Sequence, residues 1–415
     1  MGVSILNCTF FGVFIIAVSK GFEAYLSLCI AILVGALVGV LAYRHINKII
    51  VFQLLLSTFM LAKLVPNIYR AVTYSYDWQI QKDDILNSKF VKKPNIYYLQ
   101  PDGYVDFDYI KKGYYKFNND EFKTFLKQND FVTYNGFRSN YRSTLSSNTS
   151  IFSMAHHYYN HKKSFQEFTN AREIITVKNP VLDIFNANKY KTNLILDNPY
   201  LVVNRPILAY DYCNIDYSDI PFLSKGINIL IDNKTDLLNA IDDNTSFSNF
   251  YFVRYPIPGH IHSSKSSSNG KVEERDQYLK DLESSNMWLK EIVTSIVAKD
   301  AHALIIISSD HGGYVGYDYT GQHRRKTGDP DLVRSIFSSV LAIRWPEDEV
   351  PDYEDELKTS VNLFRVVFSY LCENEDYLRA LADDKSFDVI SKDAPFGIYE
   401  VINENAEVVF DKVEK

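Results

Sequence analysis

Two places in the sequence combine metal-binding residue types with a preceding run of apolar residues. Asp102 follows the apolar segment 95–100, and Asp310 with His311 follows the segment 303–308. Carboxylate and imidazole donors without sulfur suit Zn²⁺ or Mn²⁺ better than Ca²⁺. A buried strand that ends in two ionisable side chains is costly unless those side chains are bound. Taken alone, Asp102 also fits a common Asp-Gly turn, but together the two places predict a catalytic metal centre.

Hydroxyl groups are concentrated in residues 138–154, which pass into an apolar run compatible with a helix. A Ser or Thr at the amino terminus of a helix lies among unpaired backbone N–H groups, which can hold an anion such as phosphate. A neighbouring divalent cation lowers the pKa of such a hydroxyl enough to make it a nucleophile. The candidates, which otherwise act as helix caps and turn formers, are Thr144, Ser143, Ser146, Ser147 and Thr149.

Three histidines and two arginines are further candidates. His260 and His262 lie in a loop rich in Pro, Gly and Ser, where a surface role is the alternative to substrate contact. His323 precedes three basic residues, so it is either a ligand or part of a basic loop that attracts phosphate. Arg138 and Arg142 flank the hydroxyl-rich segment and either clamp a phosphate or pair with acidic surface residues.

The elements that must position these residues alternate between strands and helices. Such alternation predicts an α/β sandwich with a mostly parallel central sheet. In such sheets the active residues gather at the carboxyl ends of the strands. We expect strands at 95–100, 193–196, 227–231, 249–254, 303–308 and 339–344, helices at 120–127, 181–187, 273–298 and 363–371, and a hairpin at 396–410.

The amino-terminal segment is almost free of charge. Its apolar runs cover residues 5–19, 24–43 and 49–64. The second run is uncharged over the roughly 20 residues that a ~30 Å hydrocarbon core requires, and three runs in series favour a bundle of about three transmembrane helices. Arg44, His45 and Lys48 between the second and third runs predict a cytoplasmic loop. The amino terminus is then cytoplasmic, and everything after Tyr69 lies on the outer face.

Composition excludes two classes of protein. The chain of 415 residues has 44 Lys and Arg against 51 Asp and Glu. Removing the first 70 residues, with five basic and one acidic side chain, leaves a net charge of −11, which makes a poor partner for nucleic acid. Four cysteines rule out a disulfide-built scaffold, and Cys213 and Cys372 either pair or are buried thiols.

The sequence divides into three parts. Residues 1–68 form the expected anchor, and residues 93–415 form the expected α/β domain. Residues 69–92 form a juxtamembrane connector, whose aromatic side chains suit a membrane interface: Tyr74, Tyr76 and Trp78.

The order of these motifs along the chain resembles the order found in the alkaline phosphatase superfamily. Within it, the chain is most similar to membrane-anchored sulfatase-like enzymes, the group that includes phosphoethanolamine transferases and lipoteichoic acid synthases. The likeness covers residues 93–410 and extends to the membrane-spanning amino terminus. It implies the alkaline-phosphatase/sulfatase-like sandwich and a metal-dependent transfer or hydrolysis of an ester.

The resemblance also implies a role for each candidate. Asp102, Asp310 and His311 match metal ligands, and Thr144 matches the nucleophile that also touches the metal. His260 or His262 matches a substrate-contacting histidine, while His323 matches a late histidine near the leaving group or a second metal.

The chain departs from the family pattern in three ways. It lacks the Cys/Ser-x-Pro-x-Arg motif of formylglycine sulfatases near the hydroxyl-rich segment, which disfavours sulfate hydrolysis by that route. Arg254 occupies the probable first histidine position of the His/Pro segment, and Gly259 separates Pro258 from His260. Three spans are also fewer than several of these transferases possess.

The expected function is therefore a membrane-anchored, metal-dependent phosphotransferase or phosphodiesterase at the outer face of the inner (plasma) membrane. With Zn or Mn bound, it would move a phospholipid head-group unit, such as phosphoethanolamine or phosphoglycerol, to an envelope glycan or lipid. The alternatives are a sulfuric or phosphoric ester hydrolase of the same fold, and a catalytically silent membrane protein that binds a glycan or a partner protein.

Overall fold

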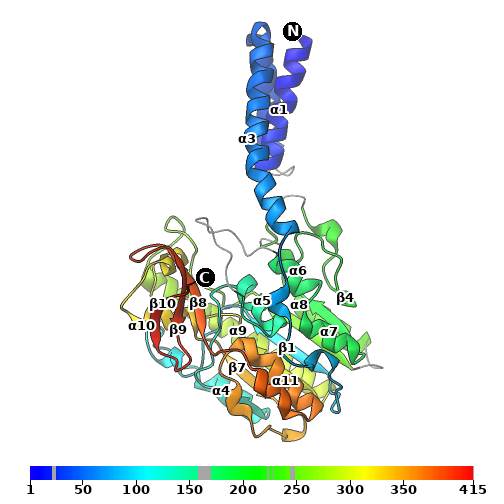
Figure 1. Ribbon diagram of the computed structural model, residues 1–415, viewed down its shortest axis with the longest axis vertical. Helices are drawn as coiled ribbons and strands as arrows, with labels where there is room; N and C mark the ends of the chain where they lie inside the picture. Colours follow the sequence, from blue (N-terminus) through cyan, green and yellow to red (C-terminus); the bar gives the residue numbers. More distant parts are fainter. Residues whose placement is uncertain (21–24, 158–169, 222–223, 228, 244–247, 415) are drawn as a thin grey trace. The chain divides into compact units, whose positions relative to one another are not determined.

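The computed structural model describes residues 1–20, 25–157, 170–221, 224–227, 229–243 and 248–414, which form two compact units (Figure 1). One unit contains Met1–Ser75, Asn198–Arg205 and Ile215–Leu230. The other contains Tyr76–Asp197, Pro206–Asn214 and the chain from Ile231 onward. The candidate site residues belong to the second unit.

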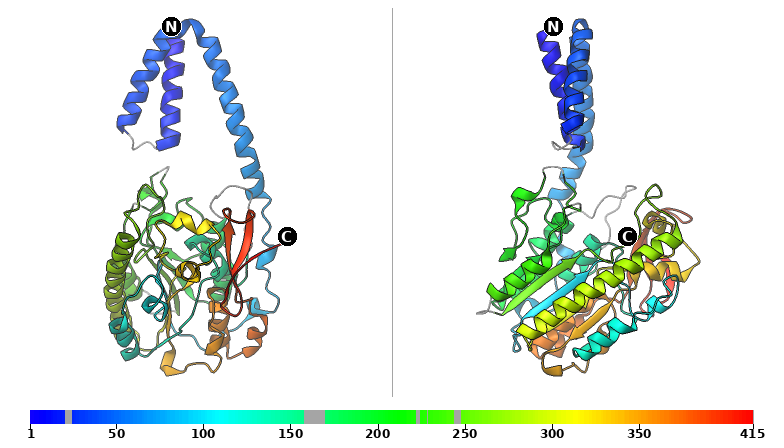
Figure 2. Two further views of the ribbon diagram at one scale, coloured as in Figure 1. Left: turned by 90° about the vertical axis from the view of Figure 1, so that its left-hand side faces the viewer. Right: turned by 180° about the vertical axis from the view of Figure 1, so that it is seen from behind.

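The first unit begins with three apolar helices, α1 (Gly2–Lys20), α2 (Tyr25–Leu41) and α3 (Ile46–Val72). α1 and α2 lie side by side as an antiparallel pair (Figure 2). Among the described helices, one stretch, Tyr43–Gln79, is long and apolar enough to cross a membrane, while α1 and α2 are shorter apolar helices.

Close packing and one polar contact join these helices. A Cβ atom on Gly39 of α2 would lie 2.4 Å from the Cα of Ile5 in α1, so only glycine allows this approach. Small residues at helix crossings are typical of membrane helices. Gln53 of α3 donates a hydrogen bond to Asn7 of α1 at 2.9 Å.

The second unit is built on a seven-stranded sheet in the order β2-β7-β6-β1-β5-β3-β4. Its strands are β1 (Ile96–Pro101), β2 (Phe131–Thr133), β3 (Lys191–Ile195), β4 (Tyr212–Cys213), β5 (Asn249–Tyr255), β6 (Leu304–Ser308) and β7 (Leu341–Arg344). The β6-β1-β5-β3-β4 portion is parallel, whereas β7 runs antiparallel to both of its neighbours. The α/β class predicted from the sequence is confirmed, with a mixed sheet.

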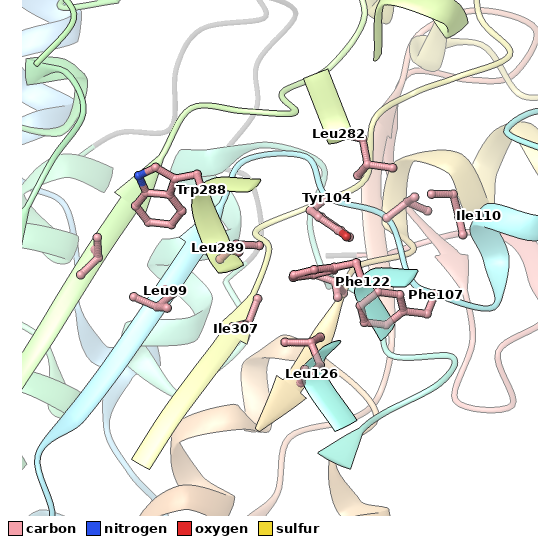
Figure 3. Packing of buried hydrophobic residues seen from close by; sticks show 14 of the residues in the cluster. Leu99, Tyr104, Phe107, Ile110, Phe122, Leu126, Leu282, Trp288, Leu289 and Ile307 are labelled. Atoms are coloured by element: carbon pink, nitrogen blue, oxygen red, sulfur yellow. The ribbon is translucent and has the colours of Figure 1, made fainter. Parts of the chain in front are cut away.

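Both faces of the central strands are buried, and side chains alternate between two cores. Leu99 of β1 and Ile307 of β6 face α9 (Lys271–Lys299), where they pack with Leu289 (Figure 3). Tyr98 of β1 points the other way and stacks on Phe252 of β5, with ring centroids 5.4 Å apart. Strands covered on both faces explain the continuous apolar runs in the sequence.

The remaining helices surround this sheet. They are α4 (Asp120–Gln128), α5 (Thr144–Ser153), α6 (Ala171–Thr176), α7 (Pro180–Ala187), α8 (Asn233–Asp243), α10 (Pro330–Phe337) and α11 (Leu363–Cys372). Phe364 of α11 and Phe152 of α5 pack together against the face of the sheet opposite α9, with ring centroids 5.6 Å apart.

A second sheet lies at the carboxyl terminus, with strands β8 (Ser386–Ile390), β9 (Gly397–Ile402) and β10 (Val408–Lys412) in antiparallel order β10-β9-β8. The predicted terminal hairpin is confirmed as β9 and β10. The predicted strand at 227–231 includes Asn228, which lies outside the described residues. For the other residues of this segment the prediction is wrong, because they are not in a strand. Ile227 and Leu230 are 54% and 77% exposed and pair with no described strand, and Gly226, with φ +76°, turns the chain just before them.

Candidate active site

Four neighbouring parallel strands deliver charged residues to one edge of the sheet. In the order β6-β1-β5-β3, their carboxyl ends carry Asp310 with His311, then Asp102, then Arg254, then Asp197. Adjacent strands in register place these side chains together, with Gln100 of β1 opposite Arg254 of β5. The site is therefore preorganised by the most deeply buried part of the fold.

Backbone contacts fix the loop that carries Asp102. Its N–H donates to Tyr255 O, and its carbonyl accepts from Gly259 N, both at 2.8 Å. The next residue, Gly103, has φ +66°, and a Cβ there would lie 2.0 Å from Gly259 O. Only glycine fits this turn, which brings residues 255–262, the His/Pro loop, beside Asp102.

Asp102, Asp310 and His311 form a group whose ligand atoms all lie within 4.8 Å of one another. His311 Nε2 is 3.5 Å from Asp102 Oδ1 and 3.6 Å from Asp310 Oδ2. His311 Nδ1 lies 2.9 Å from Gly312 O, which can only accept, so this contact leaves the Nε2 lone pair for a metal.

Two oxygen atoms of this group support metal binding. Asp102 Oδ1 and Asp310 Oδ2 are buried and have no hydrogen-bond partner among the described residues. An unpaired buried carboxylate oxygen is costly. These are the same two atoms that face His311 Nε2, so the donor set fits a divalent cation that accepts oxygen and imidazole ligands.

The pKa values of the two carboxyl groups are shifted in opposite directions. Burial, together with the negative charge of Asp310, raises the pKa of Asp102. Burial also opposes ionisation of Asp310, but the charges of His311 and Arg254 and a hydrogen bond from Thr144 lower its pKa overall. Asp310 is thus held as the anion.

Thr144 is the first residue of α5, and its hydroxyl meets the metal-binding group. It lies close enough to Asp310 to lower the pKa of that carboxyl, and its Oγ1 lies 3.5 Å from Arg254 Nη2. The side chain is buried to 8% exposure. α5 is held in place by Asn148, whose amide exchanges two hydrogen bonds with Gln100 of β1, at 2.8 and 2.9 Å.

The other candidate hydroxyls have local partners. Ser143 and Ser146 share a hydrogen bond of 2.7 Å. Ser147 donates to Tyr141 O at 2.8 Å, and Thr149 donates to the carbonyl four residues earlier at 2.7 Å. Within the hydroxyl-rich segment, Thr144 is the candidate with contacts to the metal-binding group.

Of the two loop histidines, His260 lies nearer to the metal-binding group. Its ring centroid is 5.9 Å from that of His311, and its Nδ1 contacts Ile261 O at 2.7 Å. His262 contacts Glu274 of α9 at 2.9 Å and is half exposed. The structure thus brings His260, but not His262, against His311 of the metal-binding group.

His323 is buried beside the carboxyl-terminal sheet. Its Nδ1 lies 2.6 Å from Asp388 Oδ2 of β8, and Asp388 also forms an ion pair of 2.9 Å with Arg142. Burial lowers the pKa of His323 to about 4, although the charge of Asp388 acts in the opposite direction. The imidazole is therefore neutral at pH 7, with Nδ1–H donating to Asp388 and Nε2 left as an acceptor.

The ring of Tyr314 lies between the metal-binding group and His323. Its ring centroid lies 5.9 Å from those of both His260 and His311, and 6.3 Å from that of His323. Its hydroxyl donates to Arg142 O at 2.5 Å, just before α5. Tyr314 has φ +62°, a costly conformation for a bulky residue that is typical of functional sites.

Sequence reasoning missed several residues of this site. Arg254 was identified only as a departure from the family pattern, although it ends an apolar strand. Asp197 also follows an apolar strand, which is the signal that would have revealed it. Asp388 interrupts the apolar strand β8, whereas nothing in the sequence pattern marks Tyr314. Arg138 hydrogen-bonds to the carbonyls of the carboxyl-terminal segment rather than to the metal-binding group.

No protein-family model and no curated protein matches the chain. The chain is similar to the solved C-terminal periplasmic domain of EptC from Escherichia coli, with 12% identity and a TM-score of 0.49, over 74% of this chain and 93% of that domain. The same domain in complex with Zn matches with 12% identity and a TM-score of 0.47, over 76% and 93%.

A full-length membrane protein is also similar. It is the integral membrane protein lipooligosaccharide phosphoethanolamine transferase A from Neisseria meningitidis, with 12% identity and a TM-score of 0.42, over 85% of this chain and 70% of that one. This protein is a phosphoethanolamine transferase, which is one of the enzyme types that the sequence resemblance names. The chemistry proposed for this chain rests on its own residues.

Proposed function

We propose that the chain is a membrane-anchored, metal-dependent phosphotransferase of the sulfatase-like group. It moves a phospholipid head-group phosphoryl unit, such as phosphoethanolamine or phosphoglycerol, through Thr144 to an envelope glycan or lipid. The carrying observation is the convergence of the Thr144 hydroxyl with Asp102, Asp310 and His311, two of whose buried oxygens lack a hydrogen-bond partner among the described residues.

The proposed ligands of the metal are Asp102, Asp310, His311 and Thr144. A Zn²⁺ or Mn²⁺ ion held by these residues would supply a Lewis acid that lowers the pKa of the Thr144 hydroxyl and balances the charge on phosphoryl oxygens. Zinc is a natural candidate because the donor set consists of carboxylate, imidazole and hydroxyl groups. The similar EptC domain has been solved in complex with Zn.

Thr144 then gives up its hydroxyl proton to solvent and attacks the phosphorus of the donor diester. The bond from phosphorus to the lipid oxygen breaks, the lipid leaves as an alcohol, and the head group stays on Thr144 as a phosphothreonine ester. Backbone N–H groups in the first turn of α5 face the phosphoryl oxygens. An acceptor hydroxyl gives up its proton and attacks the same phosphorus, the bond from phosphorus to the Thr144 oxygen breaks, and Thr144 takes a proton back from solvent.

Two histidines are assigned to proton transfer. His260, exposed on its loop beside His311, protonates the departing lipid oxygen. His323 offers a neutral Nε2 that takes the proton of the acceptor hydroxyl, because Asp388 holds its Nδ1–H. His262 is left out of this assignment because Glu274 binds it.

The anchor is proposed as a three-helix, multi-pass bundle in the inner (plasma) membrane. At ~1.5 Å per residue, α1 and α2 are roughly 28 and 25 Å long and α3 is roughly 40 Å long, against a hydrocarbon core of ~30 Å. Residues 1–68 form the anchor, 69–92 the connector and 93–415 the catalytic domain, on the periplasmic or extracellular side. Tethering keeps the catalytic domain close to its lipid donor.

The direct test uses the full-length protein reconstituted in vesicles that contain fluorescent phosphatidylethanolamine or phosphatidylglycerol. We expect release of diacylglycerol and, before acceptor is added, a head-group phosphate adduct on Thr144 in the intact-protein mass spectrum. Thr144→Ala abolishes both signals while the metal content stays close to wild type. Ser146→Ala removes a neighbouring hydroxyl of the same helix and keeps both signals.

Other outcomes point to other functions. Full turnover by Thr144→Ala contradicts the nucleophile assignment. Release of the free phosphorylated head group without any acceptor identifies a hydrolase. Absence of both adduct and diacylglycerol in a metal-loaded wild type supports the silent binding protein.

A further inference from the structure

Arg254 holds a permanent positive charge inside the proposed catalytic site. It lies near the end of β5, and its side chain is 4% exposed. A guanidinium does not lose its proton in proteins. Its Nη2 forms an ion pair of 2.6 Å with Asp102 Oδ2, and its Nη1 lies 3.6 Å from Asp197 Oδ1 at the end of β3.

The two oxygens of Asp102 face different groups. Oδ1 points to His311 Nε2 at 3.5 Å and is one of the unpaired atoms of the metal-binding group. Oδ2 is already bound by Arg254. Asp102 therefore offers one oxygen to a metal, and its other side is closed by the guanidinium.

The same Arg254 nitrogen approaches the nucleophile. Nη2 lies 3.5 Å from Thr144 Oγ1. When Thr144 is bonded to phosphorus, the non-bridging oxygens are attached to the neighbouring atom, within reach of this donor. A planar guanidinium with several N–H groups suits phosphoryl oxygens, and it needs no reorganisation because Asp197 and Asp102 hold it.

We propose that the site binds a single divalent ion and that Arg254 serves as its second cation, which contacts the phosphoryl oxygens during transfer. The inference rests on the proposed function of Thr144. A second divalent ion beside Thr144 would have to lie against the guanidinium and would find Asp102 Oδ2 already paired, so like-charge repulsion excludes it. Asp197 is a positioning residue that holds Arg254.

The test measures metal per chain and steady-state kinetics on the full-length protein in detergent, after loading with Zn²⁺ or Mn²⁺ and desalting. We expect one equivalent in the wild type. Removing Arg254 alone leaves buried Asp197 without that cation, which destabilises the fold, so the main variant is the double substitution Arg254→Ala with Asp197→Ala. It keeps at least one equivalent, while kcat falls on the order of 10²-fold or more and KM changes little.

Two comparisons sharpen this test. Arg254→Lys keeps the charge but not the planar fork, so it recovers part of the lost kcat. The matched control is Arg365→Ala with Asp83→Ala, which removes another buried arginine and its carboxylate, paired at 2.6 Å outside the site. This control keeps the wild-type kcat despite a similar loss of a buried ion pair.

Each result has one meaning. Two equivalents of metal in an active wild type overturn the single-ion inference while the proposed function stands. A double variant within threefold of the wild-type kcat overturns the role of Arg254. A wild type that holds no metal and shows no turnover overturns the proposed function itself.

Discussion

Replacing His323 by Asn should remove a defined part of the pH dependence of stability. Burial lowers the pKa of His323 to about 4 in the folded chain, while an unfolded chain has a histidine pKa of about 6.5. Between these two values the unfolded chain binds a proton that the folded chain does not, so the free energy of unfolding falls as pH falls. From pH 7 to pH 5 the two pKa values correspond to a loss of about 2 kcal/mol.

In His323→Asn, the amide nitrogen of the new side chain takes the place of Nδ1 and can donate to Asp388, but it does not titrate. Melting of both proteins in the same detergent from pH 7.5 to pH 5 measures the difference. We expect the wild type to lose roughly 4 °C more than His323→Asn over this range. The buried carboxyls Asp106 and Asp197, whose pKa values burial raises to about 6, act with the opposite sign but equally in both proteins.

The test of the His323 pKa is therefore the difference between the wild type and His323→Asn in how far the melting temperature falls with pH. Curves that fall in parallel would refute the reasoning, because they would show that His323 titrates alike in the folded and unfolded chains. A variant that loses more stability than the wild type on acidification would show that His323 is protonated in the fold, with its pKa above the unfolded value rather than below it.

Three further outcomes follow from the site. Asn148→Ala leaves Gln100 buried without the partner that exchanges two hydrogen bonds with it, so the chain should lose about 2 kcal/mol in unfolding measurements and kcat should fall because α5 shifts. Gly103→Ala places a Cβ 2.0 Å from Gly259 O, so its crystal structure should show a displaced His/Pro loop and its turnover should be lost. Chelation by EDTA should lower the melting temperature of the wild type, and Asp310→Ala should melt at the same temperature with or without EDTA.

Most of the central sheet could be predicted because burial on both faces leaves a strong sequence signal. The expected strand at 95–100 is β1, Ile96–Pro101, and that at 249–254 is β5, Asn249–Tyr255. Strand direction carries no such signal: β7 has the same apolar pattern as the parallel strands of the sheet, yet it runs antiparallel to both of its neighbours. The prediction of a strand at 227–231 was wrong because an apolar segment forms a strand only where a neighbouring strand is available to pair with it.

The metal-binding group was also within reach of sequence reasoning, because each of its residues directly follows an apolar strand. The contacts around this group could not be predicted from the sequence, because they depend on the order of the strands in the sheet. Arg254 and Asp102 are distant in sequence and meet only because β5 pairs with β1. His323 was identified as a candidate, but its tautomer depends on Asp388 of the carboxyl-terminal sheet, which no local pattern connects to it.

The site divides its chemistry between rigid and adaptable parts. In the proposed reaction, Asp102 and Asp310, which would hold the metal, and Arg254, which would face the phosphoryl oxygens, stand at the ends of buried parallel strands, where no reorganisation is needed when negative charge develops. His260 instead lies exposed on the loop closed by Gly259, so it can follow leaving groups of different size. Because phosphoryl charge is common to all donors while the leaving group varies, changes of substrate in this scaffold should alter the loop around His260 and leave the strand-end charges in place.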